Sequence, residues 1–364
     1  MVAWPDNRKS MKILHAITSL RKSAGTTTFV NGVSDALVNH GLSVVIAIVR
    51  IDDDYVGEKP SSAIPITTID DVISKNEDFD VVHAHGLWEL PLLRIARWAL
   101  NRKIPIVWSP HGSLAPWAMK HHWWKKALVW YFLQKRLLKK AALFHSTAKT
   151  ESEWIKSLGF NQKIYEAPLG TEIGSFGDCK DNKVVLFVGR IHPVKGLENL
   201  IKAWSIVVSL GEVATGWKLK IVGPDQYGYK CVLERIVKEL GLGGSVEFKG
   251  PKFGGALEEE YRECSCLILP SFTENFGGVV VEAMAHGKPC IASKTTPWYE
   301  LTEYGCGWWI DNQPEKMADA IEEMINIGEA GRLRMGVKGR ELVEKKYTWE
   351  AVARVVKTAY EECK

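Results

Sequence analysis

The sequence predicts an α/β protein built from two Rossmann-like domains, each a doubly wound parallel sheet. The chain has 364 residues, which is more than a single hydrophobic core usually supports. Short apolar segments alternate with helical patterns, as they do in parallel α/β units. The alternation restarts near Lys183, after residues 168–182, which contain few apolar side chains. These residues are therefore the expected linker.

The expected strands are short and apolar. In the first half they are residues 12–17, 44–49, 81–83, 104–108 and 143–145, and in the second half residues 183–188, 218–222, 246–248, 267–269 and 289–292. The expected domains span residues 11–170 and 180–348, and a last helix, about 350–364, is expected to pack back on the first domain. Ligands of open parallel sheets bind beyond the carboxyl ends of the strands. Functional residues are therefore expected in the loops after strands, in a cleft between the two sheets.

Composition places the chain among soluble globular proteins, with 46% hydrophobic and 25% charged residues. No run of 18 apolar residues and no signal peptide is recognised. The seven cysteines are scattered, and Cys264 and Cys266 are expected to be buried packing thiols, so a reduced, cytoplasmic protein is expected. Residues 101–150 contain ten Lys or Arg and no Asp or Glu. This local charge indicates an anionic partner or surface near the first domain.

A cationic turn follows the first strand of the second half. It runs from Gly189 and Arg190 to Lys195 and Gly196, and the next helix is expected from Leu197. Arginine offers a planar fork of donors, lysine a mobile point charge, and glycine allows close backbone approach. This combination suits a diphosphate. A solvated turn with surface charges is the alternative interpretation.

A second strand–loop–helix segment carries two carboxylates. Gly277 and Gly278 lie where the helix is expected to begin, so its free N–H groups and positive dipole end suit an anion. Glu274 lies in the loop, and Glu282 lies within the helix on an otherwise apolar surface. A buried carboxylate is costly unless it is hydrogen-bonded. Ribose hydroxyls would meet this requirement, and so would a structural salt bridge.

The pair Glu274 and Glu282, with Phe276-Gly277 between them, resembles the acidic motif of retaining glycosyltransferases of family 4, which have the GT-B fold. Further elements follow in family order over nearly the whole chain. They are Gly189-Arg190, Lys195-Gly196, Val222-Gly223, Val246 to Gly250, Gly287 to Pro289, and Tyr347 to Trp349. The segment from Ser109 through His111 to Trp117 is similar to a motif of members that build bacterial lipopolysaccharide, O-antigen or exopolysaccharide.

The resemblance implies a role for each matching residue. Arg190 and Lys195 would bind the donor diphosphate, Glu274 the hydroxyls of the donor sugar, and Glu282 the ribose. The remaining donor-binding positions are the backbone of Phe276, Gly277, Gly278 and Val279, the base-lining residues Lys249 and Gly250, and Gly25 of a phosphate loop. In that loop Ala24 replaces the family's usual first glycine, which leaves the path of the loop open.

His111 would hydrogen-bond a hydroxyl of the donor sugar, whereas His83 and His85 are expected to be structural. The family needs no metal and no cofactor beyond its nucleoside-diphosphate sugar. The run Asp52 to Asp54 is accordingly interpreted as a solvated loop.

The segment from Trp117 to Lys140 combines aromatic and basic residues. On a helical projection one side carries Trp123, Trp124, Ala127, Trp130, Tyr131, Leu137 and Leu138, and the other carries Lys125, Arg136, Lys139 and Lys140. Such a helix suits an anionic membrane interface. A core-facing helix with a solvated basic side is the alternative, and no base-reading motif supports a nucleic-acid partner.

The expected function is transfer of a hexose from a nucleoside-diphosphate sugar to a sugar hydroxyl of a cell-surface glycan, with a lipid-linked acceptor and retention of configuration. The enzyme would be cytoplasmic, at the inner face of the plasma membrane. Three alternatives stay open. They are a nucleotide-sugar epimerase on the same fold, a two-lobed non-catalytic binding protein, and an inactive family member.

Overall fold

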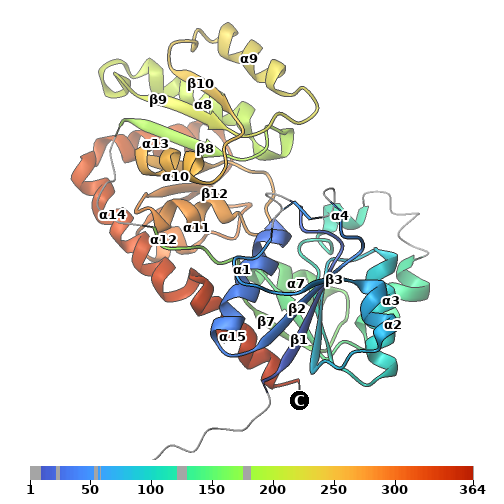
Figure 1. Ribbon diagram of the computed structural model, residues 1–364. Helices are drawn as coiled ribbons and strands as arrows, with labels where there is room; N and C mark the ends of the chain where they lie inside the picture. Colours follow the sequence, from blue (N-terminus) through green and yellow to red (C-terminus); the bar gives the residue numbers. More distant parts are fainter. Residues whose placement is uncertain are drawn as a thin grey trace, which may run out of the picture. The chain divides into compact units, whose positions relative to one another are not determined.

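The computed structural model describes residues 10–21, 25–52, 56–57, 59–120, 129–174 and 182–363. It divides into two compact units (Figure 1). The first comprises Met1–Gly170 together with Trp349–Lys364, and the second comprises Thr171–Thr348. The last helix thus belongs to the first unit. The second unit begins ahead of the expected residue 180.

The first unit contains a seven-stranded parallel sheet in the order β3-β2-β1-β4-β5-β6-β7. Its strands are β1 (Lys12–Ile17), β2 (Ser43–Ile48), β3 (Ile66–Thr68), β4 (Val81–His85), β5 (Ile106–Ser109), β6 (Leu143–Ser146) and β7 (Lys163–Glu166). Its helices are α1 (Gly25–Asn39), α2 (Ile69–Lys75), α3 (Leu90–Asn101), α4 (Pro116–Lys120), the π-helical turn η1 (Trp130–Gln134), α6 (Lys135–Leu138), α7 (Lys149–Ser157) and α15 (Trp349–Glu361). Strands β3 and β7 were not expected from the sequence. Both are edge strands with polar residues and lack the apolar run that identifies a central strand.

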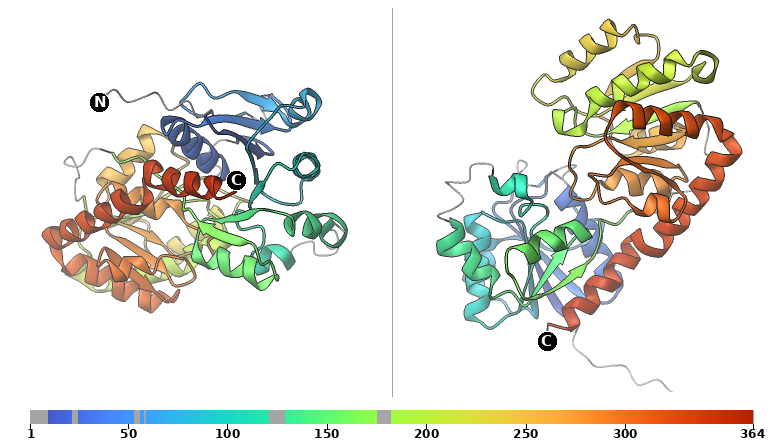
Figure 2. Two further views of the ribbon diagram at one scale, coloured as in Figure 1. Left: turned by 90° about the horizontal axis from the view of Figure 1, so that it is seen from below. Right: turned by 180° about the vertical axis from the view of Figure 1, so that it is seen from behind.

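Alternate residues of the sheet supply two separate cores. Leu14 and Ala16 of β1 pack on the face covered by α3, whereas Ile13 and Ile17 pack on the opposite face with α1 and α15. Figure 2 shows α15 lying alongside α1. Both faces of the sheet are therefore covered, as in a doubly wound fold.

The second unit contains a six-stranded parallel sheet in the order β10-β9-β8-β11-β12-β13. Its strands are β8 (Val184–Val188), β9 (Lys218–Val222), β10 (Val246–Gly250), β11 (Cys266–Leu269), β12 (Cys290–Ser293) and β13 (Gly307–Ile310). Its helices are α8 (Leu197–Ser209), α9 (Lys230–Glu239), α10 (Gly255–Glu263), α11 (Gly278–Ala285), α12 (Glu300–Glu303), α13 (Pro314–Asn326) and α14 (Gly328–Leu342), with short turns η2 (Pro193–Lys195), η3 (Gly211–Ala214) and η4 (Val343–Tyr347). The sequence did not identify β13, an edge strand that begins with glycine.

The expected α/β class with two parallel sheets is confirmed. Each sheet reverses its strand order once, between β1 and β4 and between β8 and β11. Such reversal points are where loops from neighbouring strands leave in opposite directions and leave room for a ligand. Over the part of the chain that is described, no helix combines the length and apolar content required to cross a bilayer.

Candidate active site

The two segments that the sequence singled out in the second unit leave neighbouring strands. The cationic turn follows β8, the carboxylate-bearing loop follows β11, and these strands are paired at the reversal point of the sheet. The backbone joins the two loops, because Phe272 N–H donates to the carbonyl of Val194 at 2.8 Å. The cationic turn therefore contacts the loop that leads into helix α11, within one unit.

Lys195 and Glu274 make direct contact across the two loops. The Lys195 ammonium group donates to Glu274 Oε1, and the Ser271 hydroxyl donates to the same oxygen at 2.8 Å. Both charged side chains are mostly buried, with 15% of Lys195 and 13% of Glu274 exposed. Charge pairs at this depth are screened less by salt than surface pairs. The ammonium group of Lys195 and the carboxylate of Glu274 are thus held in fixed positions at the carboxyl end of the sheet.

Glycine is required where the loops approach each other. Gly196 has φ of +69°, and a Cβ there would lie 2.0 Å from the carbonyl oxygen of Pro270. Gly223, which follows β9, has φ of +149°, and its Cβ would lie 1.9 Å from the carbonyl oxygen of Gly189. Three neighbouring loops therefore pack at backbone distance, as the glycines of the motif predicted.

Helix α11 begins at Gly278, directly after Gly277 with φ of +83°. The indole N–H of Trp298 donates to the carbonyl of Phe276 at 2.6 Å and holds the preceding peptide in place. A Cβ on Gly277 would lie 2.8 Å from Leu269 Cδ2. The first amides of a helix have no partner within the helix, so the start of α11 offers donors beside this loop.

Glu282 is the buried carboxylate of α11. The Tyr261 hydroxyl donates to its Oε2 at 2.6 Å, and burial raises the pKa of Glu282 above its ordinary value. His286 donates from Nδ1 to the backbone carbonyl of Glu282 at 2.8 Å and stacks on Tyr261. Within the described residues Glu282 makes no salt bridge, and its Oε1 has no protein donor. The structural salt bridge weighed as an alternative is therefore not formed in this part of the chain.

Arg190, Lys249 and Gly250 lie toward the β10 edge of the same sheet end. Arg190 is exposed and donates to Gln226 Oε1 at 2.9 Å. Lys249 contacts Glu247 at 2.8 Å, a hydrogen bond that raises the pKa of Lys249, and Gly250 accepts from Gly223 N–H at 2.8 Å. Arg190 does not contact the Lys195–Glu274 pair.

His111 follows β5 in the first unit with φ of +49°, and its Nε2 lies 3.0 Å from Nδ1 of His85. Burial lowers the pKa of His111 from 6.5 to about 3, so the ring is neutral at physiological pH. Behind it lies a cluster of hydrogen-bonded side chains, of which the sequence motifs had indicated only His83 and His85. Its members, apart from His83 and His85, are His15, Ser109, His145 and Tyr360, and all are buried.

A signal for this group exists in the strand pattern. His15 of β1 pairs in register with His83 of β4, and His85 pairs with Ser109 of β5. Residues two apart in a strand share a face, so all of these side chains lie on the face covered by α1 and α15. The register of the strands, which the sequence does not show, brings them together.

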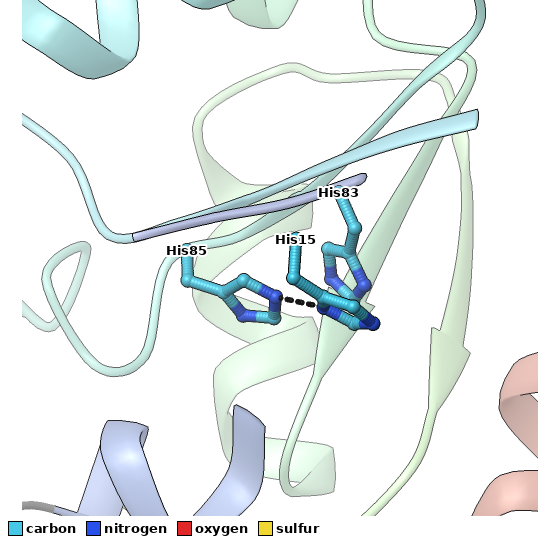
Figure 3. Close-up of side chains that lie close together, drawn as sticks. All are labelled: His15, His83 and His85. Atoms are coloured by element: carbon cyan, nitrogen blue, oxygen red, sulfur yellow. Dashed lines mark hydrogen bonds between the residues drawn. The ribbon is translucent and has the colours of Figure 1, made fainter. Parts of the chain in front are cut away.

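His15, His83 and His85 are close enough together to suggest a metal site (Figure 3). Their candidate ligand atoms lie within 4.8 Å of one another. Each of their six ring nitrogens, however, faces a hydrogen-bond partner within the unit. A metal ion would have to displace these hydrogen bonds.

Gly25 is the first residue of α1. Ala24, Asp53 and Asp54 lie outside the described residues.

The segment from Trp117 to Lys140 is described in part, and its Trp123, Trp124, Lys125 and Ala127 lie outside the described residues. Trp130 and Leu138 are buried in the core of the first unit, where Trp130 contacts Trp88 and Phe160. The core-facing interpretation therefore holds for these two side chains. The basic side is exposed at Arg136, Lys139 and Lys140, as expected.

A groove lies beside this segment, between α3 and the η1–α6 turn. It has a volume of about 380 Å³ and is lined by the exposed apolar residues Leu90 and Phe132 and by Arg97, Arg136 and Lys140. Phe132, within the π-helical turn η1, is exposed, whereas Gln134 at the end of the same turn is buried and accepts from Trp88 N–H at 3.1 Å. Apolar and basic groups thus occur together at the surface, at positions other than the tryptophans.

Two family models match consecutive parts of the chain. "Glycosyl transferase 4-like domain" matches residues 66–169, and "Glycosyl transferases group 1" matches residues 172–342. Among curated proteins, a D-inositol 3-phosphate glycosyltransferase of Corynebacterium glutamicum is 31% identical over 192 residues, or 50% of this chain and 43% of that protein. The matched region spans less than half the length of the first relatives found.

Solved structures resemble the whole chain. Anabaena HepE in complex with UDP and glucose superposes with a TM-score of 0.75 at 18% identity, covering 97% of this chain and 100% of that one. The lipopolysaccharide outer core galactosyltransferase WaaB superposes with a TM-score of 0.70 at 16% identity, covering 97% and 99%. At these identities the similarity establishes the fold.

Proposed function

We propose that this chain is a GT-B glycosyltransferase of the family 4 type, and that it transfers a hexosyl group from a nucleoside-diphosphate sugar to a glycan hydroxyl. The observation that carries the proposal is the contact of Lys195 with Glu274 beside the start of α11, at the reversal point of the second sheet. A cation, a carboxylate and helix amides there suit a sugar diphosphate: positive groups for the phosphates and an acceptor for sugar hydroxyls.

Charge development explains why these groups suit a transfer reaction. When the bond from the sugar to the diphosphate breaks, negative charge grows on the leaving phosphate oxygens. Lys195 and the amides of α11 are positioned before the reaction, so they stabilise that charge without reorganisation. The diphosphate would share Lys195 with Glu274, whose carboxylate then accepts from a hydroxyl of the sugar. Arg190, at the exposed rim, would add a planar pair of donors to the phosphates.

Glu282 is the proposed ribose-binding residue. Tyr261 occupies its Oε2, which leaves Oε1 to accept from a ribose hydroxyl. The tyrosine hydroxyl bond and the stacked His286 hold the carboxylate in one orientation. The backbone around Lys249 and Gly250 would line the base.

The proposed reaction retains the configuration of the sugar and needs no metal ion. The acceptor hydroxyl approaches on the face from which the diphosphate leaves, and the leaving phosphate oxygen takes its proton. Gly25 at the start of α1 would contribute its amide to the phosphates, and His111 would bond a hydroxyl of the donor sugar.

A lipid-linked cell-surface glycan is the proposed acceptor, in a cytoplasmic enzyme bound to the inner face of the membrane. The groove lined by Leu90, Phe132, Arg97, Arg136 and Lys140 supports this part, since apolar residues flanked by cations suit an anionic bilayer surface. The fold resembles that of WaaB, a lipopolysaccharide outer core galactosyltransferase, and we propose a role in lipopolysaccharide or related polysaccharide synthesis.

One experiment tests the function directly. The full chain is incubated with a panel of nucleoside-diphosphate hexoses, with and without cell-envelope glycolipids, and release of nucleoside diphosphate and glycosylated product are measured. Acceptor-dependent release with one donor supports the proposal. An epimerised sugar in the absence of an acceptor would indicate an epimerase. Binding of the donor without any turnover under all conditions would indicate a binding protein or an inactive member.

A further inference from the structure

Seven hydrogen bonds connect His111 to a single backbone carbonyl through the interior of the first unit. In order, they join His111 to His85 (3.0 Å), His85 to His15 (2.7 Å), His15 to Tyr360 (3.5 Å), Tyr360 to His83 (2.6 Å), His83 to Ser109 (2.5 Å), Ser109 to His145 (2.5 Å), and His145 to the carbonyl of Ala167 (2.7 Å). We call this set the histidine relay. The link between His85 and His15 is drawn in Figure 3.

The direction of the relay is determined at its Ala167 end. A carbonyl oxygen only accepts, so His145 Nε2 must carry a proton and donate. Burial lowers the pKa of His145 from 6.5 to about 4, so the ring is neutral and its Nδ1 has a lone pair. That lone pair accepts the proton of the Ser109 hydroxyl.

The next two links follow from the single proton of each hydroxyl group. Ser109 has used its proton toward His145, so its oxygen accepts from His83 Nε2–H. Burial lowers the pKa of His83 well below its ordinary value, so His83 is neutral and its Nδ1 accepts from the Tyr360 hydroxyl. The Tyr360 oxygen is then an acceptor, and His15 Nε2–H points to it across the longest contact of the relay.

The last two links reach His111 by the same reasoning. His15, also neutral because of burial, accepts at Nδ1 from His85 Nε2–H. His85 in turn accepts at Nδ1 from His111 Nε2–H. A neutral His111 that carries its proton on Nε2 has none on Nδ1. Within the described residues His111 Nδ1 has no hydrogen-bond partner.

We propose that the histidine relay locks His111 in the Nε2–H tautomer, so that its Nδ1 is a dedicated hydrogen-bond acceptor that selects a hydroxyl donor on the ligand. His85, His15, Tyr360, His83, Ser109 and His145 are then positioning residues, because they act on the ligand only through His111. The identity of that hydroxyl as one of the donor sugar rests on the proposed function. The tautomer itself does not.

The proposal has a chemical consequence for specificity. An acceptor nitrogen binds a hydroxyl but gains nothing from a hydrogen or a fluorine in its place, because neither substituent donates. Deoxy and deoxyfluoro analogues of the nucleotide sugar should therefore both bind about tenfold more weakly at the contacted position, the effect of losing one hydrogen bond. A His111 that donated would discriminate between them, since fluorine retains weak acceptor character.

The tautomer is measured on the ligand-free full chain. Histidine side chains are labelled with ¹⁵N, and two- and three-bond ¹H–¹⁵N correlations at pH 7.5 distinguish the Nε2–H, Nδ1–H and doubly protonated forms of each ring. Comparison with His111→Gln assigns the His111 signals. Protonation of His111 on Nε2 alone is the expected result. A His111 proton on Nδ1, or rapid exchange between the two tautomers, overturns the proposal whether or not the chain is a transferase.

Tyr360→Phe tests the transmission. It removes the donor to His83 and the acceptor for His15 and should leave His111 as a mixture of tautomers. Affinity for the nucleotide sugar should fall in proportion to the fraction of His111 that leaves the Nε2–H form, about twofold for an equal mixture, while affinity for the nucleoside diphosphate stays unchanged. Tyr165→Phe is the matched control, because Tyr165 stacks on His145 at 5.1 Å and its buried hydroxyl has no hydrogen-bond partner among the residues that the structure describes. Ser109→Ala interrupts the next link and serves if Tyr360→Phe does not fold.

The outcomes separate the two proposals. A single Nε2–H tautomer that survives Tyr360→Phe would refute the relay as its cause. A locked tautomer in a chain that transfers no sugar would keep the inference on His111 and refute the proposed function. Titration with Zn²⁺ tests whether His15, His83 and His85 form a metal site. Stoichiometric loss of the His15, His83 and His85 correlations would show a metal site in place of the relay.

Discussion

At Lys195 and Glu274, opposite charges 79 residues apart in the sequence meet at the end of the second sheet. The motif in the sequence identified both residues, because each lies in the loop that follows a short apolar strand. It could not show that they contact each other, since that depends on the pairing of β8 with β11. The sequence contained even less information about the histidine relay, because the relay depends on the register of the strands and on the position of α15.

Replacement of Lys195 by alanine should lower kcat about a hundredfold while the protein stays folded. The reason is the loss of one preorganised charge beside the leaving diphosphate, which typically costs about 3 kcal/mol. Steady-state kinetics with the identified donor measure the effect. Lys316→Ala, which removes a lysine paired with Asp319 on the surface of α13, is the control and should retain full activity. Equal turnover in the two variants would remove Lys195 from the site.

A second substitution tests the proposed role of Glu282 in binding the nucleotide sugar. Tyr261→Phe removes the hydroxyl that orients its buried carboxylate, so the KM for the nucleotide sugar should rise about tenfold while kcat changes little. Initial rates over a range of donor concentrations separate the two parameters. A fall in kcat at constant KM would assign Glu282 to the chemical step instead.

Among the elements, every central strand was predicted from the sequence, whereas the edge strands β3, β7 and β13 were missed and only the edge strand β10 was predicted. Strands β8 and β11 are continuous apolar runs, because both faces of their sheet are covered, whereas in β1 and β4 buried histidines interrupt the apolar run. The edge strand β7 has two charged ends and half-buried middle residues, so hydrophobicity does not distinguish it from a loop. The π-helical turn η1 was also unpredictable, because a regular helical projection assumes 3.6 residues per turn throughout.

The packing of α1 against α15 predicts that an added methyl group at Gly32 lowers the stability of the first unit, whereas helix propensity alone predicts that it raises it. A Cβ on Gly32 would lie 2.2 Å from the indole of Trp349. Gly32→Ala should therefore destabilise the first unit by about 1–3 kcal/mol, although alanine ordinarily favours a helix by about 1 kcal/mol. Urea denaturation followed by circular dichroism measures the change. Gly243→Ala, at a position with open space around it, is the control, and stabilisation by Gly32→Ala would contradict the close packing.

The groove beside α3 predicts electrostatic membrane binding. Reversing two of its charges, with Arg97→Glu and Arg136→Glu together, should weaken binding to vesicles that contain phosphatidylglycerol by roughly thirtyfold or more, since each cation near an anionic surface contributes about 1 kcal/mol. Vesicle co-sedimentation at low salt measures it. Lys202→Glu with Lys238→Glu makes the same change of charge on exposed positions of α8 and α9 and should have little effect. Equal losses in both double variants would indicate a general effect of net charge.

At the scale of the whole molecule, the sequence predicted the proposed functional residues at the reversal point of the second sheet but not those at the reversal point of the first sheet. The alternation of strands and helices predicted both parallel sheets, and the loops at the reversal point of the second sheet carry the motifs that were recognised. The reversal point of the first sheet lies between β1 and β4, where His15, His83 and His85 of the relay lie on one face. No local motif marks them, since buried histidines at strand positions look like any packing residue.

Buried neutral histidines make stability depend on pH. The folded pKa values of His15, His111 and His145 lie at about 3, 3 and 4, below 6.5, so the unfolded chain binds more protons between these values and neutrality. Stability contributed by these rings is complete above pH 6.5 and is lost as the pH falls. At pH 5.5 each histidine costs roughly 1 kcal/mol. The raised pKa of Glu282 acts in the opposite direction, but it is a single group in the other unit.

Guanidinium denaturation at pH 7.5 and pH 5.5 measures this dependence, and tryptophan fluorescence and circular dichroism report on the transition. A lower midpoint at pH 5.5 is expected. A midpoint that does not change, or rises, would show that the rings are already protonated in the folded protein.

Because α15 belongs to the first unit, that unit is discontinuous along the chain. During synthesis, residues 10–170 leave the ribosome early, yet the layer beside α1 lacks its second helix until residues 349–361 have been translated. Tyr360, near the end of that helix, supplies the only hydroxyl that the structure places between His15 and His83. Until the second unit has been made, the part of the relay formed by His111, His85 and His15 is therefore not connected to the part that runs from His83 to Ala167.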